Sequence, residues 1–166
     1  FVERHALAVA GSCPAAAIHV HSDDHVKGRI FEIVERKEGA LYEIIIYFKR
    51  KRSRIKLWAR MFNLCRHGRG YLIAYDILVS KFGKPDIIHA NIIYPAAIVA
   101  WIWSFFTGIP YIISEHWTLY LTGDRRIIPS PCITRRAVKK AFALVPVTPQ
   151  LGTALLSLGY RSRYFV

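Results

Sequence analysis

Polar residues stand where two short apolar runs of this sequence end, and their side chains are of types that bind sugars and phosphates. His116 closely follows the run of residues 111–114, between Glu115 and Trp117. An imidazole exchanges hydrogen bonds with hydroxyl groups, and in its cationic form it can bind a phosphate. We therefore expect His116 to be the leading functional residue. The alternative is a histidine that only caps or packs the end of a strand.

A second polar group follows the apolar run of residues 86–89. His89 ends this run, and Asn91 comes shortly before Pro95, where the sequence predicts the start of a helix. Backbone N–H groups at a helix N-terminus attract anions and hydroxyl groups. Asn91 is therefore a candidate binding residue, and an asparagine that merely caps the turn is the alternative.

One strand–helix–strand unit, predicted over residues 84–117, would position both polar groups. Pro95 suits the first turn of a helix, and Gly108 suits the point where that helix ends. The runs 86–89 and 111–114 are short and largely apolar, as is typical of parallel strands covered on both faces. Because ligands bind outside the carboxyl ends of such strands, both groups should lie at one edge of a parallel sheet.

The rest of the sequence predicts an α/β fold in a single domain over residues 1–166. Residues 30–35 and 42–48 are β-rich and should form a hairpin around residues 36–39. Because a helical pattern occupies the first residues without a cap, we expect that more sequence precedes Phe1. The remaining predicted elements are strands at 15–21, 143–147 and 163–166 and helices at 1–10, 131–141 and 149–158.

The most unusual stretch of the chain is strongly basic. The formal net charge is +13, and no acidic residue lies between Glu43 and Asp76. Apolar residues at helical spacing predict an amphipathic helix in this stretch, interrupted at residues 67–70. We expect Trp58 and Phe62 to pack in the core. The residues that give this spacing are Ile55, Trp58, Phe62 and Cys65.

Three interpretations of the basic helix stay open: a solvated face, a nucleic-acid patch, or a patch that meets a membrane surface. No recognisable nucleic-acid-binding module is present, so no specific nucleic acid is predicted as a partner. Attraction to anionic lipid requires no insertion of side chains. We therefore predict that a group of basic residues can contact an anionic membrane surface: Lys49, Arg50, Lys51, Arg52, Arg54, Lys56 and Arg60.

Metal sites and membrane spans are not supported by the sequence. The three cysteines lack metal-ligand spacing, and His19, His21 and His25 have no second ligand cluster, so neither a metal nor another cofactor is predicted. The cysteine usage fits a reducing compartment. Residues 90–114 are all uncharged, but the helix predicted within them, residues 96–107, is too short to cross a bilayer.

Four segments resemble the N-terminal half of a GT-B glycosyltransferase of the large retaining family 4, also called glycosyl transferases group 1. They are residues 1–5, 84–91, 108–116 and 143–150, and the Gly-x-Pro, strand, x-His pattern at 108–116 is the most specific. The resemblance extends over essentially the whole chain. It implies a Rossmann-like three-layer domain with a mostly parallel sheet, which holds the acceptor while a second domain holds the nucleotide-sugar donor.

The resemblance also implies a role for one of the candidate residues. His116 would act as the catalytic residue that faces the donor sugar. From their positions at the strand ends, and not from the resemblance, we expect Asn91, Glu115, Trp117 and Thr118 to line the acceptor side. The acceptor would be a cell-envelope or lipid-linked glycan, and the protein would be cytoplasmic, at the inner face of the membrane. The donor domain is expected outside residues 1–166, so this chain alone should be inactive. The alternatives are a domain of a GT-B nucleotide-sugar epimerase and a basic module that binds anions or membranes.

Overall fold

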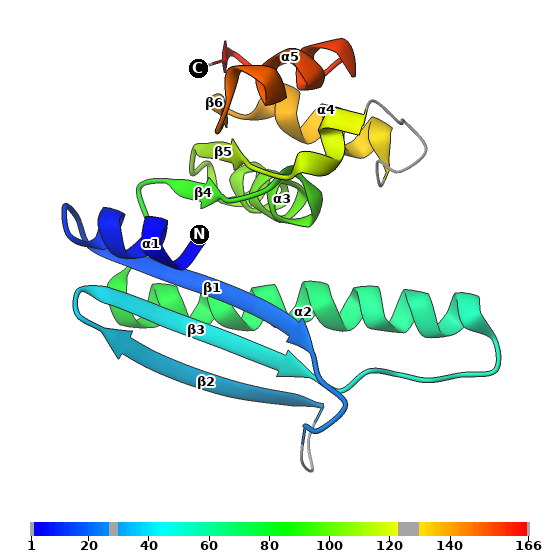
Figure 1. Cartoon of the computed structure of the whole chain (residues 1–166). Coiled ribbons are helices and arrows are strands. Elements are labelled where there is room, and N and C mark those ends of the chain that lie inside the picture. Colours follow the sequence, from blue (N-terminus) through cyan, green and yellow to red (C-terminus); the bar gives the residue numbers. More distant parts are fainter. Residues whose placement is uncertain (1, 27–29, 123–129, 166) are drawn as a thin grey trace. The chain divides into compact units, whose positions relative to one another are not determined.

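The computed structural model describes residues 2–26, 30–122 and 130–165 and shows a mixed α/β chain (Figure 1). The chain divides into two compact units, Phe1–Lys84 and Pro85–Val166. Each unit has its own cluster of buried apolar side chains. The expectation of a single domain over residues 1–166 stays a prediction.

The first unit contains a three-stranded sheet in the order β1-β3-β2. Strands β1 (Ala15–Ser22) and β3 (Leu41–Phe48) are parallel, and β2 (Phe31–Glu38) is antiparallel to β3. Gly39 turns the chain between β2 and β3 with a left-handed φ of 58°, so the predicted hairpin is confirmed. Helix α1 (Val2–Ala10) packs against β1.

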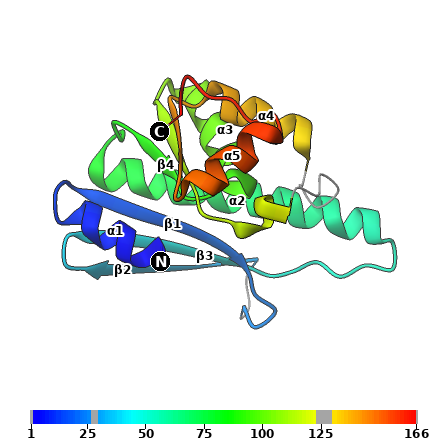
Figure 2. The same ribbon diagram turned by 45° about the horizontal axis from the view of Figure 1, so that its top comes forward.

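A single long helix, α2 (Lys56–Phe82), follows the sheet, and the predicted interruption at residues 67–70 is wrong. Gly70 is buried in the middle of this helix, where a Cβ atom would come within 2.7 Å of the Val20 side chain. The glycine therefore serves close packing of helix on strand and does not end the helix, although glycine lowers helix propensity. Both views show α2 running along one side of the sheet and α1 on the other (Figures 1 and 2).

The core of the first unit lies between α2 and the sheet. Small residues of the helix, Gly70 and Ala74, together with Leu78, face the apolar side chains of β1 and β3. The expectation that Trp58 and Phe62 pack in this core is wrong, because their side chains are 54% and 50% exposed. The N-terminal half of α2, which carries them, extends beyond the end of the strands (Figures 1 and 2).

The second unit contains a sheet of four parallel strands in the order β4-β5-β6-β7. They are β4 (Ile88–Ala90), β5 (Tyr111–Glu115), β6 (Ala143–Pro146) and β7 (Tyr164–Phe165). The predicted strand–helix–strand unit is thereby confirmed as a parallel pair, β4 and β5. The chain as a whole is mixed α/β, with one mixed sheet and one parallel sheet.

Helical segments connect these strands. The helical segments of the unit are η1 (Ile93–Ala97), α3 (Ile98–Thr107), η2 (Thr118–Thr122), α4 (Pro131–Lys140) and α5 (Pro149–Ser157). The α-helix α3 begins at Ile98, three residues after the predicted start at Pro95. It is preceded by the π-helical segment η1, in which Tyr94 has extended backbone angles (φ −119°, ψ 127°). Gly108 ends α3 with a left-handed φ of 71°.

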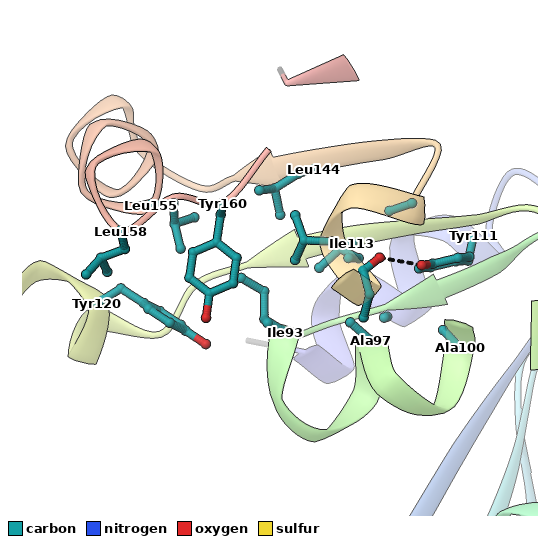
Figure 3. Packing of buried hydrophobic residues seen from close by; sticks show 14 of the residues in the cluster. Ile93, Ala97, Ala100, Tyr111, Ile113, Tyr120, Leu144, Leu155, Leu158 and Tyr160 are labelled. Carbon is teal, nitrogen blue, oxygen red and sulfur yellow. Dashed lines mark hydrogen bonds between the residues drawn. The ribbon is translucent and has the colours of Figure 1, made fainter. Parts of the chain in front are cut away.

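Three buried tyrosines frame the core of the second unit (Figure 3). The Tyr111 hydroxyl donates to the Ala137 carbonyl, and the Tyr160 hydroxyl lies 3.1 Å from that of Thr134. Tyr120 packs edge-on against Tyr160. Burial raises the pKa of all three phenols, so they stay protonated. This core fixes the parallel strands whose carboxyl ends carry the candidate site.

Candidate functional site

The carboxyl ends of β4 and β5 lie side by side. Their parallel register pairs His89 with Ile112 and Ala90 with Ile113. His89 also reaches Ser114 of β5, with 2.8 Å between its Nε2 atom and the serine Oγ. The loops that carry Asn91 and His116 therefore leave the sheet at the same edge, as the sequence predicted.

Glu115 joins these two loops from inside the protein. One of its carboxylate oxygens accepts a hydrogen bond from the Ile93 N–H at 2.7 Å. The other accepts from the N–H groups of His116 at 2.9 Å and Trp117 at 2.7 Å. A buried acceptor that satisfies three backbone donors fixes the paths of both loops.

The side chain of Glu115 is completely buried. The expectation that it lines the acceptor side is therefore wrong, because a carboxylate enclosed in this way cannot meet a ligand directly. Burial raises the pKa of Glu115 above its ordinary value, and the three N–H donors partly offset this effect because they favour the charged form. Glu115 therefore holds the two loops in place, and only neighbouring residues can contact a ligand.

Four of the predicted site residues remain accessible at this edge. His116 and Asn91 are partly exposed, and Trp117 and Thr118 are exposed. The Trp117 ring packs edge-on against Tyr120, with 6.0 Å between the ring centroids. The edge thus offers an imidazole, an amide, a hydroxyl and an aromatic ring, which are groups that can hydrogen-bond and pack against a sugar.

Three contributors to this geometry were missed by the sequence analysis: Ser114, the Ile93 N–H and Tyr120. Ser114 carries a weak signal, since it is a hydroxyl residue in an otherwise apolar strand. No local signal identifies the Ile93 N–H, because it acts through Glu115, 22 residues further along the chain. The signal for Tyr120 is limited to an aromatic residue three positions after Trp117. Within the described residues, no group of three or more histidine, cysteine or acidic side chains could hold a metal ion.

The seven basic residues predicted to meet a membrane lie in the first unit and are all exposed. Among the described residues, Arg52 is the only one of the seven that makes an ion pair, with Asp24 at 2.5 Å. The segment before α2 is bound to the helix by Asn63, which exchanges two hydrogen bonds with the Lys51 backbone. Where the structure describes the chain, no helix is long and apolar enough to cross a bilayer.

A second basic group lies in the second unit, around the C-terminal end of α4. Its side chains line an open hollow of about 600 Å³. Cations near a helix C-terminus interact favourably with the helix dipole, so Lys139 and Lys140 have a structural explanation. Arg135 is held by a hydrogen bond of 3.0 Å to the Leu158 carbonyl. The remaining residues of the hollow are Arg136, Gly159 and Arg161.

Searches of protein-family models, curated proteins and solved structures found no match for this chain. The geometry stands alone. No relative therefore assigns a role to the edge formed by β4 and β5 or to the residues that it presents.

Proposed function

We propose that this chain is the acceptor-side domain of a retaining glycosyltransferase with the GT-B fold, of the family called glycosyl transferases group 1. The observation that carries the proposal is the bonding of Glu115 to Ile93, His116 and Trp117. It joins the most specific of the resembling segments, residues 108–116, to the loop that follows another of them, residues 84–91, at the carboxyl edge of a parallel sheet. This edge is where open α/β sheets bind their ligands.

Each residue at this edge has a proposed role. His116 is the catalytic residue and donates a hydrogen bond to the donor sugar, which its partly exposed imidazole can do. Asn91 and Thr118 bind acceptor hydroxyl groups, and the exposed ring of Trp117 packs against the acceptor. Glu115 is a positioning residue that acts through the backbone of both loops.

The proposal includes a larger protein of which this chain is one part. In it, the chain adopts the Rossmann-like three-layer fold of one GT-B half, and a second domain binds the nucleotide-sugar donor. This chain alone transfers no sugar, because the charge that develops on the nucleotide diphosphate needs stabilising groups from the donor domain. The proposed acceptor is a cell-envelope or lipid-linked glycan, handled at the cytoplasmic face of an anionic membrane.

The test is sugar transfer by the protein that joins this chain to its donor domain, compared with its His116→Ala variant. We expect kcat to fall on the order of 100-fold or more, as when one donor of a transition-state hydrogen bond is removed. His25→Ala is the matched control, since His25 is an exposed histidine of the first unit and should leave turnover unchanged. Unchanged turnover with His116→Ala contradicts the proposed role. Conversion of the nucleotide sugar to an epimer without an acceptor would instead favour the epimerase alternative.

A further inference from the structure

The N-terminal half of α2 carries an apolar face that no described part of the first unit covers. We call it the outer face of α2. At least half of the surface of each of its five large side chains is exposed, which far exceeds what scattered surface apolar residues present. Its residues are Leu57, Trp58, Met61, Phe62 and Leu64, together with the exposed Cys65.

Helical spacing places this outer face away from the sheet. Leu64 and Cys65 follow Met61 by three and four residues, and Met61 follows Leu57 by four, so these residues share one side of the helix. The opposite side carries the line through Asn63, Gly70, Ala74 and Leu78, of which the last three are buried against the strands.

The basic segment, residues 49–54, occupies the inner side of the same half-helix. Asn63 exchanges hydrogen bonds of 2.7 and 3.1 Å with the backbone of Lys51, and Arg66 donates to the Lys49 carbonyl. The side of the helix that could have been covered by apolar packing is therefore taken by a charged segment. Trp58 and Phe62 are left outside, where they lie against each other with ring centroids 6.3 Å apart.

Positive charge gathers on the side of this half-helix that faces away from the outer face. The basic segment contributes five cationic side chains, and Lys56 and Arg60 add two from the helix itself. No acidic residue occurs anywhere between Glu43 and Asp76. An exposed apolar face with Trp, Phe and Leu opposite a dense group of Lys and Arg is the pattern of helices that lie in a membrane interface.

We infer that the N-terminal half of α2 lies flat in the surface of an anionic phospholipid bilayer, with its outer face among the acyl chains. The basic segment then lies level with the lipid phosphates. A second copy of this chain is a poor occupant, because it would bring the same positive charges against the first. The inference takes up the anionic membrane of the proposed function and adds which side chains enter the lipid, but its geometry does not depend on sugar transfer.

The native cysteines allow a direct test of this orientation. Cys65 lies on the outer face, whereas Cys132 is exposed on α4 of the second unit. An environment-sensitive fluorophore is attached to Cys65 in the C13S/C132S variant, and to Cys132 in C13S/C65S as the control. On vesicles of phosphatidylglycerol and phosphatidylcholine, we expect the probe at Cys65 to shift to the blue and to be quenched by spin-labelled acyl chains. The probe at Cys132 should not change.

Two pairs of variants separate the apolar contribution from the charged one, measured as partition coefficients on the same vesicles. The double variant W58A/F62A should weaken binding by about tenfold or more, because two large apolar side chains no longer leave water when the protein binds. The double variant F105A/F106A is the matched control, because it also removes two exposed aromatic rings, which lie on α3 and are 76% and 78% exposed. It should change binding less than about twofold, within the range of neutral surface substitutions.

A second pair of variants, each with three cationic side chains replaced by glutamine, measures the contribution of charge in the same way. R54Q/K56Q/R60Q should weaken binding on the order of 100-fold at low salt, at roughly fivefold per cation near an anionic surface. R136Q/K139Q/K140Q removes the same charge from α4 and should have a much smaller effect. Circular dichroism confirms that each variant is folded.

Several results would overturn the inference. The first is binding to vesicles that leaves the fluorescence of the Cys65 probe unchanged. The second is a loss of binding that is equal for a test variant and its matched control. The third is a dimer that dissociates when Trp58 and Phe62 are both replaced by alanine. Binding only to an acidic protein and not to vesicles would also overturn it. None of these measurements depends on sugar transfer, so their failure leaves the proposed site untouched, and failure of the His116→Ala test leaves the membrane inference untouched.

Discussion

At the scale of single residues, Glu115 determines how the candidate site is held together. Both of its carboxylate oxygens accept backbone N–H groups, and only a carboxylate offers two acceptors at these positions. In Glu115→Gln the new amide NH₂ must face one of the N–H donors. We expect a loss of about 1–3 kcal/mol of unfolding free energy, the usual cost of a buried donor without a partner.

The pH dependence gives this prediction a second, independent measurement. Because burial raises the pKa of Glu115, the folded protein holds this proton more tightly than the unfolded chain, whose value is near 4.5. Unfolding free energy should therefore fall as the pH rises from about 4.5 through the raised pKa, and Glu115→Gln should lack this component. Urea unfolding of both proteins across this pH range is the measurement, with the exposed Glu32→Gln as control. If the unfolding free energies of wild type and Glu115→Gln change with pH in parallel, then burial does not raise the pKa of Glu115.

The residue scale also shows where sequence analysis reaches its limit. The polar residues at both strand ends could be predicted, because strand ends follow from short apolar runs and from Pro95 and Gly108. The inward direction of Glu115 could not, since it depends on the Ile93 N–H, which lies 22 residues earlier in the chain. A contact of that separation leaves no local pattern.

At the scale of elements, α2 shows why hydrophobic spacing predicted the wrong face. The large residues Trp58 and Phe62 suggested the buried side, but the helix meets the sheet through Gly70 and Ala74. Small residues bring the helix close to β1 and give little hydrophobic signal of their own. The strands and the parallel pairing of β4 with β5 were predicted correctly, because alternation and apolar runs report strands directly.

Two glycines of α2 that are only two residues apart, and so lie on different sides of the helix, test this account. Gly70→Ala would place a Cβ 2.7 Å from the Val20 side chain, so we expect it to destabilise the protein by about 1–3 kcal/mol through overpacking. Gly68→Ala meets nothing within 4 Å and should stabilise the helix by roughly 0.5–1 kcal/mol. Thermal or urea unfolding measures both. If the two substitutions shift stability in the same direction, the close approach of α2 to β1 is not what Gly70 provides.

At the scale of the whole molecule, the formal charge of +13 attracts the protein to any anionic surface, so binding alone does not identify a partner. This attraction could be predicted from composition. The outer face of α2 could not, because exposure depends on how far the helix extends beyond the strands. Charge and apolar contact therefore need to be separated by a condition that weakens only one of them.

Salt is that condition, because the Debye length falls from about 10 Å at 0.1 M to about 3 Å at 1 M, whereas apolar burial is not screened. On vesicles containing phosphatidylglycerol, we expect the wild-type chain to keep measurable binding at about 0.5 M salt. The Trp58→Ala, Phe62→Ala variant should lose it, so the ratio of their partition coefficients should grow as salt rises. On duplex DNA, where phosphate contacts dominate, both proteins should release together with one steep salt dependence. If wild type and variant leave the vesicles in parallel as they leave DNA, then charge alone holds this protein to lipid.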